Sequence, residues 1–439
     1  MTTAAEKGLL ASFAPARGEP AWLADARRAA LSRFGALGLP TTRHEDWRFT
    51  SLAPLVPLDL RRAAGAAGAG AARLLARTPA PEGARLVFVN GRYRADLSSR
   101  AGLPGAAVLS TLGEALRDAP EELRPHLGRL AGAGSGDHAF AAANEALFED
   151  GAFLRLPANV RVDAPIALVF LSDASGPVAS HPRTLVLAGE GSRATLEEIY
   201  AGGDAEPYLT NALTELVLAA GAAIEHVRLQ VEGAGAVHVS AVHAEQGAGS
   251  SLSAHAFALG GKLSRTEIRT RLAGEGARVA ANGLYMASGD QLVDNFSWVE
   301  HAVPGCSTTE SYKGVLDGRS RGVFSGRIRV LPGAQKTVAH QMNSNLLLSD
   351  DAVVDTKPQL EIFADDVKCG HGGTVGQLDE TALFYLRSRG IGEAEARSLL
   401  IWAFASEMVG LVGAPSLRAG ARNLVAARLP AAAALLEAA

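Results

Sequence analysis

A degenerate internal repeat constrains the fold of this chain more than any other feature. LVLAGEGSRATLEEI at Leu185–Ile199 is similar to LVLAAGAAIEHVRL at Leu216–Leu229, and HAEQGAGSSLSAHAF at His243–Phe257 is similar to RLAGEGARVAANGL at Arg271–Leu284. In each copy a glycine marks the same turn, at intervals of roughly 27 to 30 residues. These glycines are Gly191, Gly221, Gly249 and Gly276. A period in this range indicates a stacked architecture, in which each unit buries its apolar face only against its neighbours.

The repeat lies within a longer zone, about residues 151–376, of short alternating runs separated by Gly, Asp and Pro. Examples are Thr184–Leu187, Glu215–Leu218, His226–Val231 and Val237–Val242. Strands this short and this frequent are typical of a sandwich, a barrel or a solenoid. The period favours the solenoid, and a β-sandwich with similar hairpins is the alternative.

The segments on either side of this zone have helical spacing. Residues 1–150 are predicted to form a mostly helical N-terminal region, in which Ala21–Leu37 has apolar residues on one face and a stop at Gly38. Residues 377–439 are predicted to form a C-terminal helical region that begins with a helix capped by Asp379.

Two further helices are predicted in the C-terminal region, at Glu393–Val409 and at about Arg418–Glu437. The apolar arc of the first is wide for a helix with one exposed face, so it either packs into the core or is covered by a partner. The candidate partner-binding residues on this arc are Leu399, Leu400, Trp402 and Phe404.

Composition excludes several classes of protein. The net charge is −4 and the sequence has no basic face, so nucleic acid and anionic membrane are poor candidates for partners. No run of about 18 apolar residues occurs, and the N-terminus lacks the apolar segment of a secretion signal. The only cysteines are Cys306 and Cys369, which indicates a reduced, cytoplasmic protein rather than a disulfide framework.

The densest polar constellation is ADDVKCGHGG at Ala364–Gly373. Cys369 and His371 stand at i and i+2, so on a strand both side chains point to the same side. Such a pair can ligate a metal, act as a nucleophile and its base, or be a buried cysteine beside a histidine in a turn. Two cysteines cannot hold a four-thiolate cluster, so Cys369 and His371 would be half a site that another subunit completes.

Other catalytic signatures are weak. Gly189-Glu190-Gly191 lacks the surrounding βαβ unit of a dinucleotide site, and Gly260-Gly261-Lys262 lacks the rest of a P-loop. Cys306 follows a Pro-Gly turn and is predicted to be structural, as are His238, His243 and His255.

Beyond these patterns, Asn282–Val409 resembles the SufB/SufD family of iron–sulfur cluster assembly proteins. The resemblance rests on DNFSWVEHAVPGCSTTESYKGVLDGRSRGVFSGRIRV at Asp294–Val330, QKTVAHQMNSNLLLSDDAVVDTKPQLEIFADDVKCGHGGTVGQLDE at Gln335–Glu380, and FYLRSRGI at Phe384–Ile391. HEDWRFTSL at His44–Leu52, the modest length and the lack of additional cysteines resemble the SufD branch rather than the SufB branch.

The resemblance implies a mainly β fold: a right-handed parallel β-helix over residues 151–376 between the N- and C-terminal helical regions. It implies a scaffold subunit of a SufBCD complex, not an enzyme, which pairs with a SufB-like chain through the β-helix ends. It also implies that the C-terminal helices dock a SufC-like ATPase. The family's interface cysteine and histidine correspond to Cys369 and His371, with the histidine the better supported of the two.

The resemblance further implies that no cofactor is bound stably by this chain alone, although iron or a transient iron–sulfur cluster can be shared with the SufB-like partner. Three alternatives stay open. The chain can be a SufB-like scaffold that acts as a homodimer, a β-helix enzyme that uses Cys369 and His371, or a purely structural interaction protein.

Overall fold

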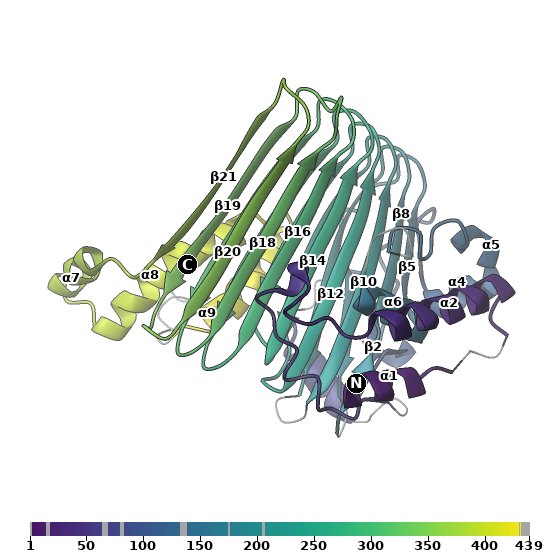
Figure 1. The fold of residues 1–439 in the computed structure, drawn as a ribbon, viewed down its shortest axis with the longest axis horizontal. Helices are drawn as coiled ribbons and strands as arrows, with labels where there is room; N and C mark the ends of the chain where they lie inside the picture. The colour runs from purple at the N-terminus through teal and green to yellow at the C-terminus, as the bar shows by residue number, and fades with distance from the viewer. Residues whose placement is uncertain are drawn as a thin grey trace.

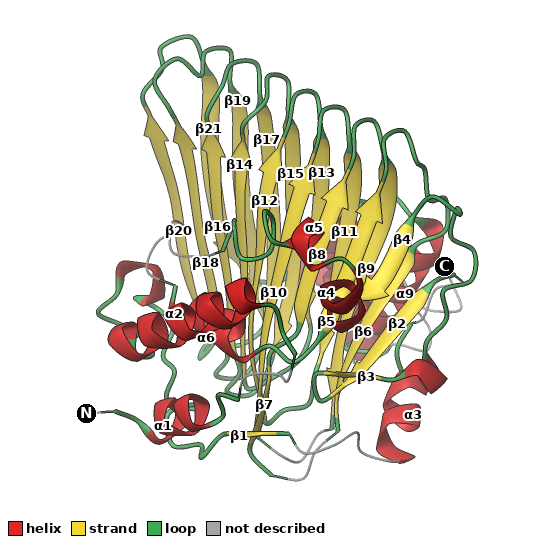
Figure 2. Cartoon of the chain, turned by 90° about the vertical axis from the view of Figure 1, so that its right-hand side faces the viewer, coloured by secondary structure: helices red, strands yellow, loops and turns green. Residues whose placement is uncertain are grey.

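The centre of the molecule is a long parallel β-helix built from two facing sheets (Figure 1). The computed structural model describes residues 2–14, 18–63, 69–79, 83–131, 138–173, 176–203, 207–429 and 431. Successive strands alternate between the sheets, so that each turn of the coil adds one strand to each sheet (Figure 2). The fold class expected from the resemblance is confirmed: the chain is mainly β, with a parallel β-solenoid core and helices at both ends.

Sheet A has the strand order β20-β18-β16-β14-β12-β10-β8-β5-β4, with β1 and β7 off this path. Its strands are β1 Arg61–Arg62, β4 Val108–Thr111, β5 Gly151–Leu156, β7 Val178–Ser180, β8 Arg183–Ala188, β10 Tyr208–Leu218, β12 Ala236–Gln246, β14 Leu263–Leu272, β16 Leu292–His301, β18 Arg321–Val330 and β20 Val353–Ile362.

Sheet B has the order β21-β19-β17-β15-β13-β11-β9-β6-β2-β3. Its strands are β2 Arg85–Val89, β3 Arg92–Tyr93, β6 Ile166–Ser172, β9 Arg193–Gly202, β11 Ala223–Val231, β13 Ser251–Ala258, β15 Arg278–Ala287, β17 Ser307–Leu316, β19 Val338–Leu347 and β21 Lys368–Gly376. Both sheets therefore begin before residue 151, because β2, β3 and β4 join them from the N-terminal region.

The repeat glycines form one row of turns along the coil. Gly191, Gly221, Gly249 and Gly276 all have φ between +63° and +71°, a conformation that costs a residue with a Cβ. The N–H of each of the first three donates to the carbonyl that precedes the glycine of the next turn, at 2.8–2.9 Å. Lys336 occupies the same turn position further along, with φ +59°, and the Gly305 N–H donates to the carbonyl before it. The predicted repeat is thus the repeat of the coil, and the sandwich alternative is wrong.

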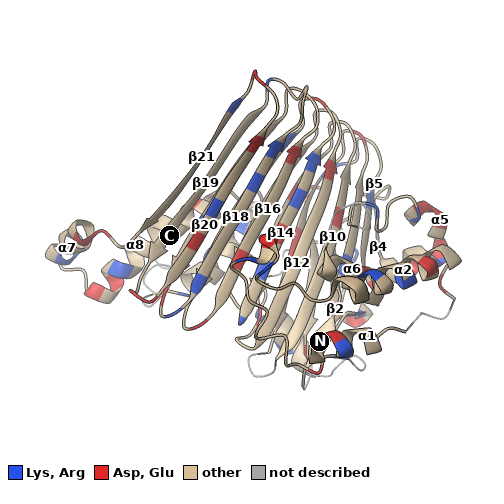
Figure 3. Ribbon diagram, viewed as in Figure 1, with Lys and Arg blue, Asp and Glu red and all other residues tan. Residues whose placement is uncertain are grey.

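In-register pairing places equivalent residues of successive turns above one another. On the outer face of sheet A this produces an alternating charged column across five strands, of which Arg271, Glu300, Arg329 and Glu361 are the last four members. Arg271 lies 3.1 Å from Glu300, and Arg329 lies 3.8 Å from Glu300 and 3.7 Å from Glu361. Both signs of charge therefore alternate across this face (Figure 3).

Most of the N-terminal helices pack on the outer face of sheet A, whereas the helix Ala69–Ala76 packs on β6 of sheet B (Figure 1). Ala21–Leu37 forms a helix as predicted, and it packs on α6. The helices of this region are α1 Ala4–Ala11, α2 Ala21–Leu37, η1 Glu45–Trp47, α3 Ala69–Ala76, η2 Ala95–Leu97, α4 Leu112–Asp118, α5 Pro120–Leu123 and α6 Ala139–Leu147.

The helices described in the C-terminal region are α7 Glu380–Ser388, α8 Glu393–Gly410 and α9 Pro415–Ala426. α8 and α9 lie against the outer face of sheet B, where Ile401, Ala405 and Met408 join apolar residues of β11–β17, and α7 packs on α8. The carboxylate of Asp379 caps α7 as predicted, accepting the N–H groups of Thr381 and Ala382.

The predicted bounds of the last helix were wrong. α9 begins three residues earlier than Arg418, because Pro415 suits the first turn of a helix, and it ends at Ala426. Residues 430 and 432–437 of the predicted helix lie outside the described residues. Within the described part of the chain, no helix is both long and apolar enough to span a bilayer.

Candidate functional site

The C-terminal end of the β-helix is open. β20 and β21 are the last strands of their sheets, and among the described residues each pairs only with the strand on its inner side, β18 or β19. Most of their residues are exposed or half-buried, whereas β10, in the middle of sheet A, is almost entirely buried. An exposed strand edge offers unpaired backbone N–H and C=O groups to another chain. Native proteins normally cover, blunt or charge such edges, so this end is suited to a partner.

Apolar side chains gather at the same end. Six of the ten large hydrophobic residues that are exposed in the described structure lie between residues 338 and 375. They are Val338, Met342, Val353, Ile362, Phe363 and Val375. We call this set, together with the edges of β20 and β21, the open-end surface. Exposed apolar side chains beside an open strand edge are typical of a protein–protein interface.

Cys369 and His371 lie on β21, within the open-end surface, and they point to the same side of the strand as predicted. Cys369 is in register with Ala339 and His371 with Gln341, and both of these β19 residues are buried between the sheets. Cys369 is half-buried against the interior apolar cluster, whereas His371 is exposed. The pair therefore lines the mouth of the β-helix interior.

The environment of Cys369 disfavours a nucleophile. Burial raises the pKa of its thiol, an effect that a backbone hydrogen bond from Ala339 only partly opposes. The reactive form of cysteine is the thiolate, and catalytic cysteines have lowered pKa values. The described residues contain no group of three or more His, Cys, Asp or Glu side chains that could hold a metal. A metal bound here would take at most two ligands from Cys369 and His371.

The four candidate residues of α8 are half-buried. Leu399, Leu400, Trp402 and Phe404 all contact the apolar cluster between the helices and sheet B. Lys313 of β17 holds this part of α8 in place: its Nζ lies 3.1 Å from the Phe404 carbonyl oxygen, 4.4 Å from the centre of the Phe404 ring and 2.6 Å from Glu407. Much of the wide apolar arc is thus explained by packing on sheet B.

Two neighbouring aromatic residues on α7 are more exposed than any of these four. Phe384 is 72% exposed and Tyr385 is 56% exposed, on a helix that projects beyond the end of the β-helix (Figure 1). Sequence reasoning missed them because consecutive aromatic residues on a nine-residue helix give no clear periodic signal. Exposed aromatic side chains on a projecting helix are a common feature of interfaces.

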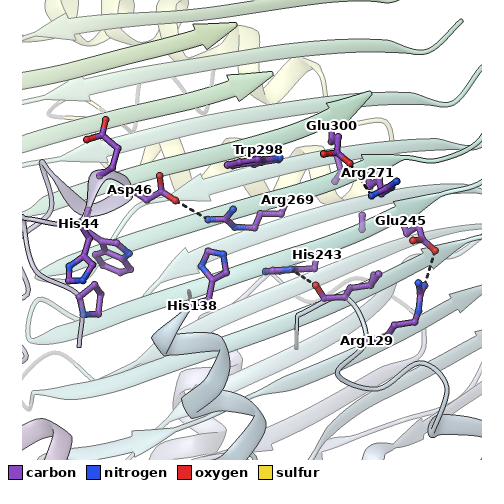
Figure 4. Close-up of a pocket in the computed structure, with 16 residues that line it drawn as sticks. His44, Asp46, Arg129, His138, His243, Glu245, Arg269, Arg271, Trp298 and Glu300 are labelled. Carbon is purple, nitrogen blue, oxygen red and sulfur yellow. Dashed lines mark hydrogen bonds and ion pairs between the residues drawn. The ribbon is translucent and has the colours of Figure 1, made fainter. Parts of the chain in front are cut away.

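A cleft of about 660 Å³ lies on the outer face of sheet A, next to η1 (Figure 4). Its cations have acidic partners: Arg129 lies 2.9 Å from Glu245, and Arg269 lies 3.4 Å from Asp46. Burial lowers the pKa of His243 to about 3, and the His243 ring is held by the Leu130 carbonyl oxygen. The charged side chains of the cleft are therefore explained by ion pairs within the chain itself.

The three histidines predicted to be structural are all buried beside polar groups. His238 Nδ1 lies 2.7 Å from Glu232, and His255 Nε2 lies 3.6 Å from Glu225. Cys306 is fully buried immediately before β17, as expected of a structural residue.

The HEDWRFTSL segment attaches the N-terminal region to sheet A. The guanidinium of Arg265 lies 4.0 Å from the centre of the Trp47 ring, and this ring also stacks on Phe140. The Thr50 hydroxyl donates to Asp294 at 2.6 Å. A segment that marks the resemblance thus has a structural role, because it covers the buried charges of sheet A.

Comparison with known proteins agrees with this architecture. A family model described as "SUF system FeS cluster assembly, SufBD core domain" matches residues 170–404, and one described as "SufBD protein N-terminal region" matches residues 16–168. The chain belongs to the SufBD family of iron–sulfur cluster assembly proteins.

Within that family the chain is similar to proteins named SufD. The iron–sulfur cluster assembly protein SufD of Escherichia coli is 31% identical over 403 residues, covering 91% of this chain and 92% of the relative. An iron–sulfur cluster assembly SufBD family protein of Synechocystis is 33% identical over 419 residues, covering 93% of this chain and 92% of the relative. SufD of Bacillus subtilis is 26% identical over 415 residues, covering 91% of this chain and 92% of the relative.

Proposed function

We propose that this chain is a cytoplasmic, non-enzymatic scaffold subunit of a SufBCD complex, in which it pairs with a SufB-like chain through the open-end surface. The observation that carries the proposal is the open end itself. Two edge strands, six exposed apolar side chains and the Cys369–His371 pair all lie at one end of the β-helix. A homologous β-helix would cover the edges with strands of matching spacing.

At this interface His371 and Cys369 form half of a site for iron or a transient iron–sulfur cluster, which is the cargo of the complex. Imidazole and thiol are ligands that iron and cluster chemistry use, and the SufB-like chain supplies the rest. The exposed His371 reaches the interface directly, whereas the raised thiol pKa makes Cys369 an auxiliary ligand.

The C-terminal helices dock a SufC-like ATPase in this proposal. The surface combines Leu399, Leu400 and Trp402 of α8 with the exposed Phe384 and Tyr385 of α7. Phe404 supports this surface from below through its contacts with Lys313. An ATPase bound here lies beside the last turns of the coil, so its movements can be transmitted to the open end (Figure 1).

The test is to co-express the chain with SufB-like and SufC-like subunits and to reconstitute clusters on the purified complex. We expect His371→Ala to lower the cluster yield while the complex stays intact. His340→Ala is the matched control, because His340 is also exposed on sheet B but points to the outer face. A normal cluster yield from the His371→Ala complex would remove the role given to this residue.

Two other assignments predict different results. A homodimeric scaffold would assemble clusters without a SufB-like chain, and its open-end surface would be occupied by a second copy. An enzyme that uses Cys369 and His371 would turn over a substrate as an isolated chain, a role that the raised thiol pKa of Cys369 opposes.

A further inference from the structure

A polar column leads from the open end into the buried interior of sheet B. Glu310 of β17, Gln341 of β19 and His371 of β21 are in-register partners on adjacent strands. Their side chains point to the same face, toward the space between the two sheets, and adjacent strands are about 4.8 Å apart. Glu310 and Gln341 are buried, and His371 is the exposed end of the column.

Gln341 has an unusual environment for a buried amide. Its Nε2 donates to the Glu310 carboxylate, which fixes the orientation of the amide group. Its Oε1 is buried and has no hydrogen-bond partner among the described residues. Burying a carbonyl oxygen without a hydrogen-bond donor costs free energy, and in native proteins most such oxygens have a donor.

The opposite sheet makes room for this amide. A Cβ built on Gly326 of β18 would lie 2.1 Å from Gln341 Nε2, so only glycine leaves space for the side chain there. The amide nitrogen of Gln341 is therefore directed at Glu310, in the space that Gly326 leaves free.

We infer that Gln341, held by Glu310, is a positioning residue for His371: its Oε1 accepts one imidazole N–H and leaves the other ring nitrogen free to face the partner. The register partner of Gln341 on its other side is His371, whose imidazole can donate a hydrogen bond. Histidines that bind metals commonly donate their second N–H to a carbonyl or carboxylate, which fixes the tautomer and the ring orientation. The inference rests on the role proposed for His371, which it deepens.

The experiment measures the tautomer of His371 in the isolated full-length chain by ¹⁵N–¹H NMR of histidine-labelled protein. His371→Gln assigns the signal, and the exposed His340 serves as an internal reference. Gln341→Leu should move the tautomer ratio of His371 toward that of His340. The double variant Glu310→Gln/Gln341→Glu exchanges the acid and the amide, so that a hydrogen-bond acceptor remains beside His371. This variant should restore a single dominant tautomer of His371.

Gln246→Leu is the matched control. It also removes a buried amide, on β12 of the other sheet, and it should leave the His371 signal unchanged. An unchanged His371 tautomer in Gln341→Leu, or an equal change in Gln246→Leu, would overturn the inference. Cluster yield of the reconstituted complex is measured separately: a normal yield in His371→Ala refutes the proposed function, while the tautomer result still decides the role of Gln341.

Discussion

Glu197 of β9 provides a stringent test of how the outer face of sheet B is packed. Its carboxyl group is in register between Ala167 of β6 and Val227 of β11, which are both fully buried apolar residues. Neither carboxyl oxygen has a hydrogen-bond partner among the described residues. Burial therefore raises the pKa of Glu197 from 4.5 to about 8.

This raised pKa makes the stability of the protein depend on pH. Between pH 4.5 and pH 8 the folded chain keeps a proton on Glu197 that the unfolded chain releases, so the free energy of unfolding falls as the pH rises. A difference of about 3.5 units (8 − 4.5), at about 1.36 kcal/mol per unit, corresponds to a loss of up to about 5 kcal/mol above pH 8. The free energy of unfolding of the neutral variant Glu197→Gln should lie within about 1 kcal/mol of the parent's at pH 5 and exceed it by several kcal/mol at pH 8.5.

The measurement is urea unfolding of both proteins at pH 5, 7 and 8.5, with hydrogen exchange of the β9 amides as a local probe. The adjacent Glu198 is the control, because it is equally buried but points into the interior beside His226 and Arg228. Burial acts to raise its pKa, but these partners lower it to about 2, so Glu198→Gln should destabilise the protein at pH 7. Equal stability of Glu197→Gln and the parent at pH 8.5 would refute the reasoning.

Three further predictions concern two exposed surfaces and one buried aromatic side chain. Val375→Glu, on an edge strand, should abolish pairing with a SufB-like chain in size-exclusion chromatography while the monomer's unfolding changes by less than about 0.5 kcal/mol; a retained complex would contradict the open-end surface. Phe384→Ser with Tyr385→Ser should weaken titration of a SufC-like ATPase by about 30-fold or more, and unchanged affinity would exclude α7 from docking. Trp47→Ala should lower the free energy of unfolding by about 3 kcal/mol. It should also expose the N-terminal helices to proteolysis, because the Trp47 ring no longer covers the Arg265 guanidinium. Protease resistance equal to the parent's would contradict this.

The coil could be predicted from the sequence because its turns impose a backbone requirement that glycine meets. Gly191, Gly221 and Gly249 recur with the period of one turn, and their positive φ angles explain why they are glycines. The same turn recurs at position 336, but it could not be recognised from the sequence, because Lys336 adopts the positive φ angle in place of a glycine. The apolar arc of α8 could be recognised too, but a helical pattern does not distinguish residues that pack on a sheet from residues that await a partner.

The candidate site could be predicted only in part, because it depends on where the coil stops. The i, i+2 spacing of Cys369 and His371 predicts that both lie on one side of a strand. The spacing does not reveal that this is the inward side, or that the strand is the last of its sheet. Gln341 and Glu310 stand one and two turns earlier in the chain, and only the register of β17, β19 and β21 brings them into line with His371. A buried polar column is fully enclosed wherever another turn follows, and it is exposed only where the repeat ends. In the proposed complex, covering the strand edges and completing the site at Cys369 and His371 would therefore be the same event.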